Sequence, residues 1–267
     1  MDFAKALLDA RTHGQVTPQP SQSVSDFDIE AGYKIGIAVD KALRQIGWRH
    51  AGRKIGFTNV AAWEEFELSN PIWSYIYDRT VIDVDFGIPE ILVSDLTAPR
   101  IEPEIILGVN ERIMGVVSDP GELAAAIDWV APGFEIVDCH FANWQFTVAD
   151  IIADFGAHAR LVIGSRKMVT DQDRDSLHQA LADATVELRY KGDIVSAGVG
   201  SNTLGGPLSA LGHLCDTITL QAWAEPIIAG EIITTGSLTD FPSVEAGQRW
   251  TAAFTGSGLS HLTIDLV

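Results

Sequence analysis

The sequence has few of the features that mark disulfide-rich or membrane-spanning proteins. Only two of its 267 residues are cysteines, Cys139 and Cys215, too few for a disulfide framework or a cysteine-rich zinc site. It has no run of about 18 uncharged apolar residues, and its charged beginning is unlike a secretory signal. We therefore expect a soluble, cytoplasmic protein with two buried free thiols.

Basic residues are also scarce. The chain has 18 Lys and Arg against 36 Asp and Glu, which gives a formal net charge of -18 at pH 7. Nucleic acids and anionic membrane surfaces bind clustered Lys and Arg, so neither is an expected partner. A small anionic substrate is still compatible with this charge, because such a molecule responds to the local site more than to the field of the whole protein.

The rest of the composition is that of a folded protein, with 46% hydrophobic and 20% charged residues. Residues 1–47 are predicted to form a helical N-terminal region. Apolar residues at helical spacing predict one helix over residues 2–12. A second helix is predicted to run to about Ile46, with Ser25 or Asp26 as its cap.

Residues 48–267 are predicted to form a β-rich core that acts as one functional domain. Short β-branched runs alternate with Gly, Pro and Asp, as in RKIGFT, TVIDVDF, EILVSDL, PEIILGV, GFEIVD, ARLVIG, GEIITTGSL and LSHLTIDLV. VELRYKGDIVSAG predicts a hairpin, and helices are predicted over residues 123–127, 171–183 and LSALGHLCDTITLQAWA. Strands and helices do not alternate regularly, so we predict an α+β fold with a large mixed or antiparallel sheet.

Two carboxylates open the apolar strand RIEPEIILG. Glu102 and Glu104 are two residues apart, so they share one strand face at roughly 6 to 7 Å. Burying two like charges together raises the pKa of one of them unless a cation lies nearby. Glu135 interrupts another apolar strand in the same way, whereas Asp138 of that strand faces the opposite side.

Three such carboxylates predict a site for Mg²⁺ or Mn²⁺ that leaves positions open for a substrate. The alternative is that Glu102 and Glu104 lie on a solvated face while Glu135 pairs with an arginine. Spacing alone leaves both interpretations open.

Lys54 and Asp78 are further candidates for chemistry. Lys54 shares a strand face with Gly52 and Gly56, so its amine has free space in which to contact an anion or move a proton. Asp78 follows aromatic residues and is a candidate acid or base. A solvated lysine and a turn-starting aspartate are the alternatives.

Two glycine-containing segments are candidates for ligand binding. The loop SAGVGSNTLGGP ends in Gly205, Gly206 and Pro207 directly before a predicted helix, but it does not match dinucleotide or P-loop fingerprints. Its backbone amides either approach a ligand at the helix start or form only a tight turn. Thr235 and Gly236 end a predicted strand with groups able to bond a carboxylate.

In order along the chain, RKIGFT, SYIYD, IEPEI, GFEIVD, NWQFTVADIIADFG, VSAGVGSNTLGGP and IITTGSL resemble the 2-hydroxypenta-2,4-dienoate hydratase and 4-oxalocrotonate decarboxylase group of the fumarylacetoacetate hydrolase superfamily. The resemblance covers about residues 30–265. It implies a helical N-terminal region, a rolled, mostly antiparallel β core, a requirement for Mg²⁺ or Mn²⁺, and a homo-oligomer.

The resemblance also implies roles for the candidate residues. Glu102, Glu104 and Glu135 would bind the metal, and Lys54 and Asp78 would transfer protons. The implied substrate-binding residues are Gly205, Gly206, Pro207, Thr235 and Gly236.

The expected function is a divalent-metal-dependent hydratase. It would add water to a 2-hydroxy-alkadienoate or unsaturated 2-oxo acid from the catabolism of aromatic or ring compounds. The alternatives are a 4-oxalocrotonate-type decarboxylase, a carbon–carbon bond hydrolase of the superfamily, and a non-catalytic subunit that assembles with an active relative.

The chain departs from the group at two motifs. It has PIWS at residues 71–74 where relatives typically carry Pro-Asp-Phe-Gly, and DFGA at residues 154–157 where they tend to have Asp-Asn-x-Ser, with His158 and Arg160 close by.

The hydrolase alternative requires a Glu–His pair that activates water, and His140 is a candidate for the histidine of such a pair. Four aromatic residues indicate a larger or more aromatic substrate, or belong to the core: Trp73, Tyr75, Tyr77 and Trp144.

Overall fold

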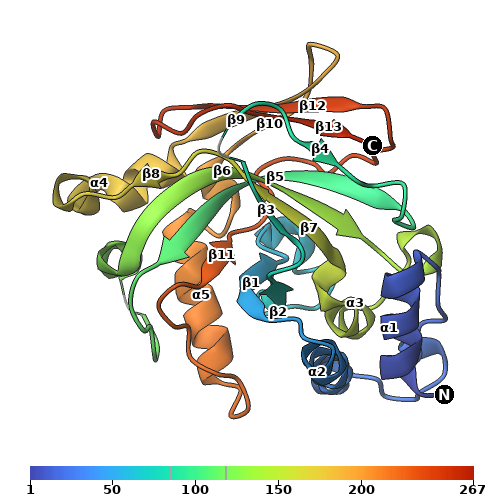
Figure 1. The fold of residues 1–267 in the computed structure, drawn as a ribbon. Coiled ribbons are helices and arrows are strands. Elements are labelled where there is room, and N and C mark those ends of the chain that lie inside the picture. Colours follow the sequence, from blue (N-terminus) through green and yellow to red (C-terminus); the bar gives the residue numbers. More distant parts are fainter. Residues whose placement is uncertain (85, 118) are drawn as a thin grey trace.

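The chain folds into two β-sheets with helices packed around them, which confirms the α+β prediction (Figure 1). The computed structural model describes residues 1–84, 86–117 and 119–267. The larger sheet has eight strands in the order β2 (Ile72–Tyr77), β1 (His50–Gly56), β11 (Ile232–Thr234), β5 (Pro99–Val109), β6 (Ile127–Asp138), β7 (His158–Ile163) and β3 (Val81–Asp83), with β8 (Lys167–Met168) beside β6. The smaller sheet has five strands in the order β10 (Asp193–Val199), β9 (Thr185–Tyr190), β12 (Arg249–Thr255), β13 (Leu262–Leu266) and β4 (Glu90–Ile91).

Five α-helices accompany the sheets in the described residues. They are α1 (Phe3–His13), α2 (Ile29–Gln45), α3 (Val148–Ala153), α4 (Asp171–Ala182) and α5 (Pro207–Thr219). In Figure 1, α1, α2, α3 and α5 lie below strands β5 and β6 of the larger sheet, and the smaller sheet lies above these strands. Short 3-10 turns, among them Val60–Ala62, Pro120–Ala126, Phe155–Ala157 and Gly200–Asn202, complete the connections.

Most element predictions agree with the structure, and the differences have local causes. The cap of α2 is Asp28, not Ser25 or Asp26, because the Asp28 carboxylate accepts the N–H of Ala31 in the first turn. The helix expected to continue through LQAWA ends at Thr219. The run TVIDVDF contributes β3, while its Asp85 lies outside the described residues. Strand β12 was not predicted.

The antiparallel pair of β5 and β6 forms the centre of the larger sheet. The two strands pair from Pro99 opposite Asp138 to Val109 opposite Ile127, and nearly every residue in both is buried. Their register places Glu102 directly opposite Glu135. Sequence spacing cannot supply this alignment, because it depends on how two separate strands pair.

Parallel pairing makes the larger sheet mixed. β11 runs parallel to β1 and antiparallel to β5, so Thr234 lies between Lys54 on one side and Ile106 on the other. The segment that follows β11 therefore reaches the region of Glu104.

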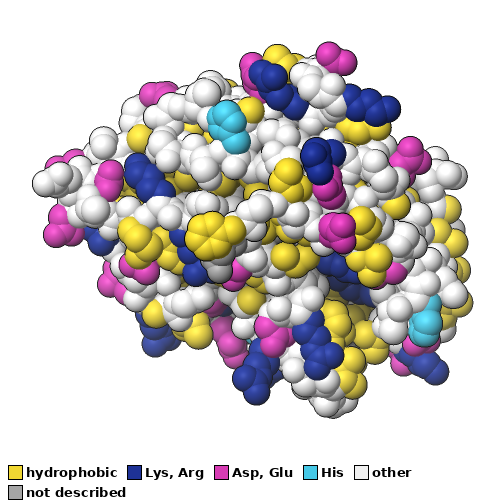
Figure 2. Space-filling model, turned by 45° about the horizontal axis from the view of Figure 1, so that its top comes forward, with side chains coloured by type: hydrophobic (Ala, Val, Ile, Leu, Met, Phe, Trp, Pro, Cys, Tyr) yellow, Lys and Arg dark blue, Asp and Glu magenta, His cyan; other side chains and the backbone are white. Residues whose placement is uncertain are grey.

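Two surface properties bear on partners. No helix in the described part of the chain is long and apolar enough to cross a membrane. On the face that Figure 2 shows, Lys and Arg side chains lie among Asp, Glu and hydrophobic side chains rather than in one basic patch.

Candidate active site

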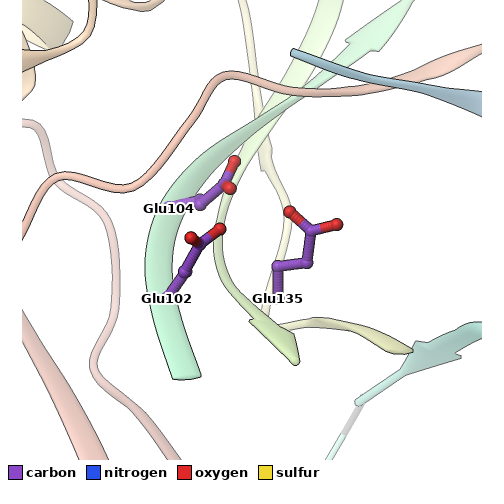
Figure 3. A group of neighbouring side chains, drawn as sticks. All are labelled: Glu102, Glu104 and Glu135. Carbon is purple, nitrogen blue, oxygen red and sulfur yellow. The ribbon is translucent and has the colours of Figure 1, made fainter. Parts of the chain in front are cut away.

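The three predicted glutamates converge on one point between β5 and β6. One carboxylate oxygen each from Glu102, Glu104 and Glu135 lies within 4.8 Å of the other two. Figure 3 shows Glu102 and Glu104 reaching from β5 toward Glu135 on β6. Glu104 and Glu135 are completely buried, whereas Glu102 is partly exposed and lines a cavity. The solvated-face alternative therefore does not describe this cluster.

Lys54 is the cation of the cluster. Its side chain is buried in β1, its Nζ lies 3.0 Å from Glu135 Oε2, and it donates a hydrogen bond of 2.8 Å to the carbonyl oxygen of Gly156. If all three carboxylates are ionised, the one ammonium leaves two negative charges unbalanced in a buried place. Such an imbalance is costly unless a further cation neutralises it.

The pKa values reflect this imbalance. Burial, reinforced by the charge of Glu135, raises the pKa of Glu102 to about 7 and that of Glu104 well above its usual value. Burial also acts to raise the pKa of Glu135, but Lys54 and then His158 outweigh it, so this pKa falls to about 2. Burial lowers the pKa of Lys54, and the three carboxylates reverse that effect and raise it. Lys54 is therefore an ammonium and Glu135 a carboxylate at neutral pH.

The hydrogen bonds of the glutamates leave a carboxylate oxygen available to bind an ion. Glu104 Oε2 accepts the backbone N–H of Gly236 at 2.8 Å, but the buried Glu104 Oε1 has no hydrogen-bond partner among the described residues. A buried polar atom of this kind is expected to have a partner. An all-oxygen donor set with a deficit of two positive charges fits Mg²⁺ or Mn²⁺.

His158 contacts the cluster from the start of β7. Its Nδ1 lies 2.7 Å from Glu135 Oε1 and its Nε2 lies 2.8 Å from the hydroxyl of Thr80, so both ring nitrogens are occupied. Burial lowers the pKa of His158. Because a carboxylate only accepts hydrogen bonds, the neutral ring carries its proton on Nδ1, facing Glu135. Arg11 of α1 donates a 2.6 Å hydrogen bond to the His158 carbonyl and so ties the N-terminal helix to the site.

A cavity of about 390 Å³ opens at Lys54 and Glu102. Gly236 also lines it, and its φ of +97° and the 1.9 Å between a Cβ added here and Thr58 Oγ1 exclude a side chain at this position. Ile72 lines the cavity at the position where the resemblance implies an aspartate. No acid therefore faces the cavity from that position.

The structure does not bring every predicted residue to this cavity. Asp78 is exposed, and its carboxylate accepts the backbone N–H of Arg49 at 3.1 Å. Thr235 is fully buried, and its hydroxyl donates to the carbonyl of Ile105. Neither residue is among those that line the cavity.

The glycine loop before α5 forms the tight turn that was one of the two interpretations of its sequence. Gly205 and Gly206 have φ values of +89° and +146°, and a Cβ on Gly206 would lie 3.0 Å from that of Ala182 in α4. The two glycines serve the turn and its close packing, and neither they nor Pro207 line the cavity. Asn202, earlier in the same loop, does line it.

Sequence reasoning missed most of the aromatic side chains at the cavity. Trp144 lines it, but Trp73, Tyr75 and Tyr77 do not. The aromatic residues that do line it, apart from Trp144, are Phe57, Phe66, Phe146 and Phe241. They come from four separate segments and share no motif, so no sequence signal joins them.

Known proteins with similar sequences are hydratases and a decarboxylase. The 2-hydroxyhexa-2,4-dienoate hydratase of Comamonas testosteroni is 29% identical over 95% of this chain and 91% of its own length. The 4-oxalocrotonate decarboxylase of Pseudomonas putida is 28% identical over 85% and 81%. The 2-keto-4-pentenoate hydratase of Paraburkholderia xenovorans (strain LB400) is 28% identical over 96% and 91%. No protein-family model matches the chain.

Solved structures show the same fold. The 4-oxalocrotonate decarboxylase of Pseudomonas putida G7, complexed with magnesium and adipate, has a TM-score of 0.89 and 23% identity over 99% of this chain and 95% of its own. The fumarylpyruvate hydrolase of Pseudomonas aeruginosa, in complex with Mn²⁺ and pyruvate, has a TM-score of 0.60 and 16% identity over 82% and 89%. In sequence the chain is thus similar to 2-hydroxydienoate hydratases and a 4-oxalocrotonate decarboxylase, and its fold is that of structures in the fumarylacetoacetate hydrolase superfamily.

Proposed function

We propose that the protein is a divalent-metal-dependent hydratase that adds water to a 2-hydroxy-alkadienoate or unsaturated 2-oxo acid from the breakdown of ring compounds. The observation that carries this proposal is the cluster of Glu102, Glu104 and Glu135 with Lys54 at one end of a 390 Å³ cavity. The hydratases among its relatives, named for 2-hydroxyhexa-2,4-dienoate and 2-keto-4-pentenoate, support the choice of substrate.

The three glutamates would hold Mg²⁺ or Mn²⁺. When bound, the ion supplies a Lewis acid that stabilises negative charge on the carboxylate and C2 oxygens of the substrate. Gly236 N–H holds the Glu104 carboxylate and His158 holds that of Glu135, so two of the three groups are oriented before any ligand arrives.

Lys54 is the proposed catalytic residue. An ammonium has three N–H donors, and Glu135 and Gly156 engage two of them. The third is available to the C2 oxygen of a substrate, because Lys54 itself lines the cavity. Its raised pKa suits it to keep a proton at that oxygen while negative charge develops there, and not to act as a base. Asp78, which is exposed and does not line the cavity, has no role in the mechanism proposed here.

A decarboxylase of the same group is the second candidate. Ile72 in place of an acid favours it, because loss of carbon dioxide needs enolate stabilisation but no group that activates water. Release of carbon dioxide, measured with 4-oxalocrotonate, separates the two. A hydrolase has less support: His140 is buried, its Nδ1 contacts Asp154 at 2.8 Å, and it does not line the cavity.

The test is activity of the purified chain alone on 2-hydroxypenta-2,4-dienoate, with Mg²⁺ and with a chelator. We expect turnover only with metal, and a loss of at least about 100-fold for Glu102→Gln, which removes one ligand. Glu90→Gln is the matched control, because Glu90 is an exposed glutamate on β4 of the other sheet. Full activity in the chelator would refute the proposal, and inactivity of the chain alone would favour a non-catalytic subunit.

We also propose that residues 1–47 and 48–267 form one functional unit within a cytoplasmic homo-oligomer. The contact of Arg11 with the carbonyl of His158 supports the first part, since it joins α1 to the segment beside the site. Removal of residues 1–17 should therefore lower activity. Light scattering of the full chain tests the oligomer, and a monomer as the active species would contradict it.

A further inference from the structure

We infer that the substrate of this site ends in an apolar group of aryl or branched-alkyl size and carries no second carboxylate. This inference rests on the proposed function, which binds the 2-oxo acid end of the molecule at the glutamate cluster. It concerns the other end of the molecule. The evidence is the shape and chemistry of the remaining cavity wall.

Five aromatic rings form one continuous arc along this wall. Successive ring centroids lie 4.9 Å apart for Phe57 and Phe66, 6.1 Å for Phe66 and Phe146, 6.5 Å for Phe146 and Trp144, and 6.1 Å for Trp144 and Phe241. All five residues line the cavity and none is fully buried. We refer to these five side chains as the aromatic arc. Partly exposed rings that meet edge to face or stacked offer an apolar ligand a large, rigid contact surface.

Arg100 stacks against two rings of the arc. Its guanidinium carbon lies 4.3 Å from the ring centroid of Trp144 and 5.1 Å from that of Phe241. Stacking of this kind fixes the position of both rings. Arg100 is not among the cavity-lining residues, so its charge is directed at the rings and at nearby Glu102.

Charge is distributed unevenly in the cavity. Within the described part of the chain, the ionisable residues that line it are Lys54, Glu102 and Asp240. Lys54 is the one cation, and it is already paired with Glu135 at the metal end. A second carboxylate would therefore meet rings and the carboxylate of Asp240, without a cation to offset its lost hydration.

The volume of the cavity, like its aromatic lining, indicates a substrate with a bulky substituent. A volume of about 390 Å³ falls within the range of roughly 300 to 1,000 Å³ that is usual for pockets that bury drug-sized ligands. A five-carbon 2-oxo acid is much smaller than such ligands. The space beside the aromatic arc is thus left for a bulky substituent.

Binding of matched 2-oxo acids to the full-length protein in Mg²⁺, followed by calorimetry, tests the inference. Oxalate probes the metal end alone. The acids 2-oxopentanoate, 2-oxo-5-phenylpentanoate and 2-oxoadipate differ only in what the fifth carbon bears: hydrogen, phenyl or carboxylate. Relative to 2-oxopentanoate, we expect the phenyl acid to bind at least about 10-fold more tightly and 2-oxoadipate several-fold more weakly.

A variant pair connects this preference to the aromatic arc. Phe146→Ala opens the middle of the arc, and we expect it to reduce the preference for the phenyl acid to about 3-fold or less, with Phe146→Leu between it and the parent protein. Phe86→Ala is the matched control, since Phe86 is 97% exposed and lies outside the cavity, and it should keep the full preference. Thermal unfolding of each variant shows that the fold is retained.

The outcomes separate the inference from the function on which it rests. If oxalate does not bind in a Mg²⁺-dependent way, the proposed function fails and the inference fails with it. If oxalate binds but the phenyl acid binds no tighter than 2-oxopentanoate, the inference alone is overturned. Tighter binding of 2-oxoadipate would also overturn it and would point to Arg100 as a second anion site.

Discussion

Strand β6 carries two buried acidic groups whose surroundings differ. Glu135 belongs to the glutamate cluster, in which two carboxylates have raised pKa values and one oxygen of Glu104 lacks a partner among the described residues. Three positions further along, Asp138 accepts the backbone N–H groups of Thr97 and Ala98 at 2.9 and 2.6 Å. Both residues are at most 1% exposed, so burial alone does not distinguish them.

Asp154 is a second buried aspartate whose surroundings resemble those of Asp138. Its carboxylate accepts the backbone N–H of His140 at 3.1 Å, contacts His140 Nδ1 at 2.8 Å and pairs with Arg11 at 3.5 Å. The aspartates thus receive their donors from the chain itself, as structural acids do. The glutamates lack enough donors of their own, and this deficit is what makes them the candidate metal site. Substitutions in the two groups should therefore have opposite effects.

The largest expected effect is that of Glu104→Gln. Activity should fall on the order of 1,000-fold or more, because a metal ligand and its charge are lost. Stability without metal should stay the same or rise, since the amide resembles the protonated acid that the raised pKa already favours. Steady-state kinetics and unfolding in a chelator measure the two. A destabilised variant would contradict the distinction between the groups.

Asp154→Asn should have the opposite effect, a loss of stability with little change in Mg²⁺ affinity. Its carboxylate is fully buried between Arg11 and His140, so loss of its charge should lower the free energy of unfolding by about 2 to 4 kcal/mol. Mg²⁺ affinity should change little at a temperature where the variant is folded. Urea denaturation and Mg²⁺ titration are the measurements, and loss of metal binding with unchanged stability would show that Asp154 belongs to the site.

His158→Ala tests whether orientation of Glu135 matters for the metal. We expect Mg²⁺ affinity to fall by roughly 10- to 100-fold, as for other groups that hold a metal ligand. His158→Asn keeps an amide near the position of Nδ1 and should recover part of the affinity. A purely structural role would lower the melting temperature of both variants without this difference in affinity.

The pH dependence of metal binding follows from the pKa of Glu102, about 7 in the metal-free site. Protons compete with the ion, so Mg²⁺ affinity should fall about 10-fold for each pH unit below that value. The metal-free protein should lose stability as pH rises from 4.5 through 7, because the folded state holds the proton more tightly than the unfolded state does. Added Mg²⁺ should remove this loss. Affinity that is constant between pH 5.5 and 8 would contradict the assignment.

The smallest effect is expected for Asp78→Asn. Asp78 is exposed and bonds only a backbone N–H in the described structure, so activity should stay within about 2-fold and stability within about 0.5 kcal/mol. Kinetics with Mg²⁺ provides the measurement. A large loss of kcat would restore Asp78 to the mechanism despite its position.

The sequence was most informative where one short segment carried the signal. The spacing of Glu102 and Glu104 and the amphipathic first helix each depend on residues close in the chain, and the structure contains both features. Asp78 and the Gly205 to Pro207 loop were predicted from their residue types and from the resemblance. Neither lines the cavity, because their placement depends on the path of the whole chain.

By itself, the sequence determined the class of fold, the candidate metal donors and the family resemblance, because strand periodicity, residue chemistry and motif order are local properties. Only the tertiary structure decided that Glu135 lies opposite Glu102, that His158 holds Glu135, and that five aromatic residues from separate parts of the chain line one cavity. Strand register and the packing of remote segments set these contacts. They arise from the free energy of the whole fold and not from any single stretch of the chain.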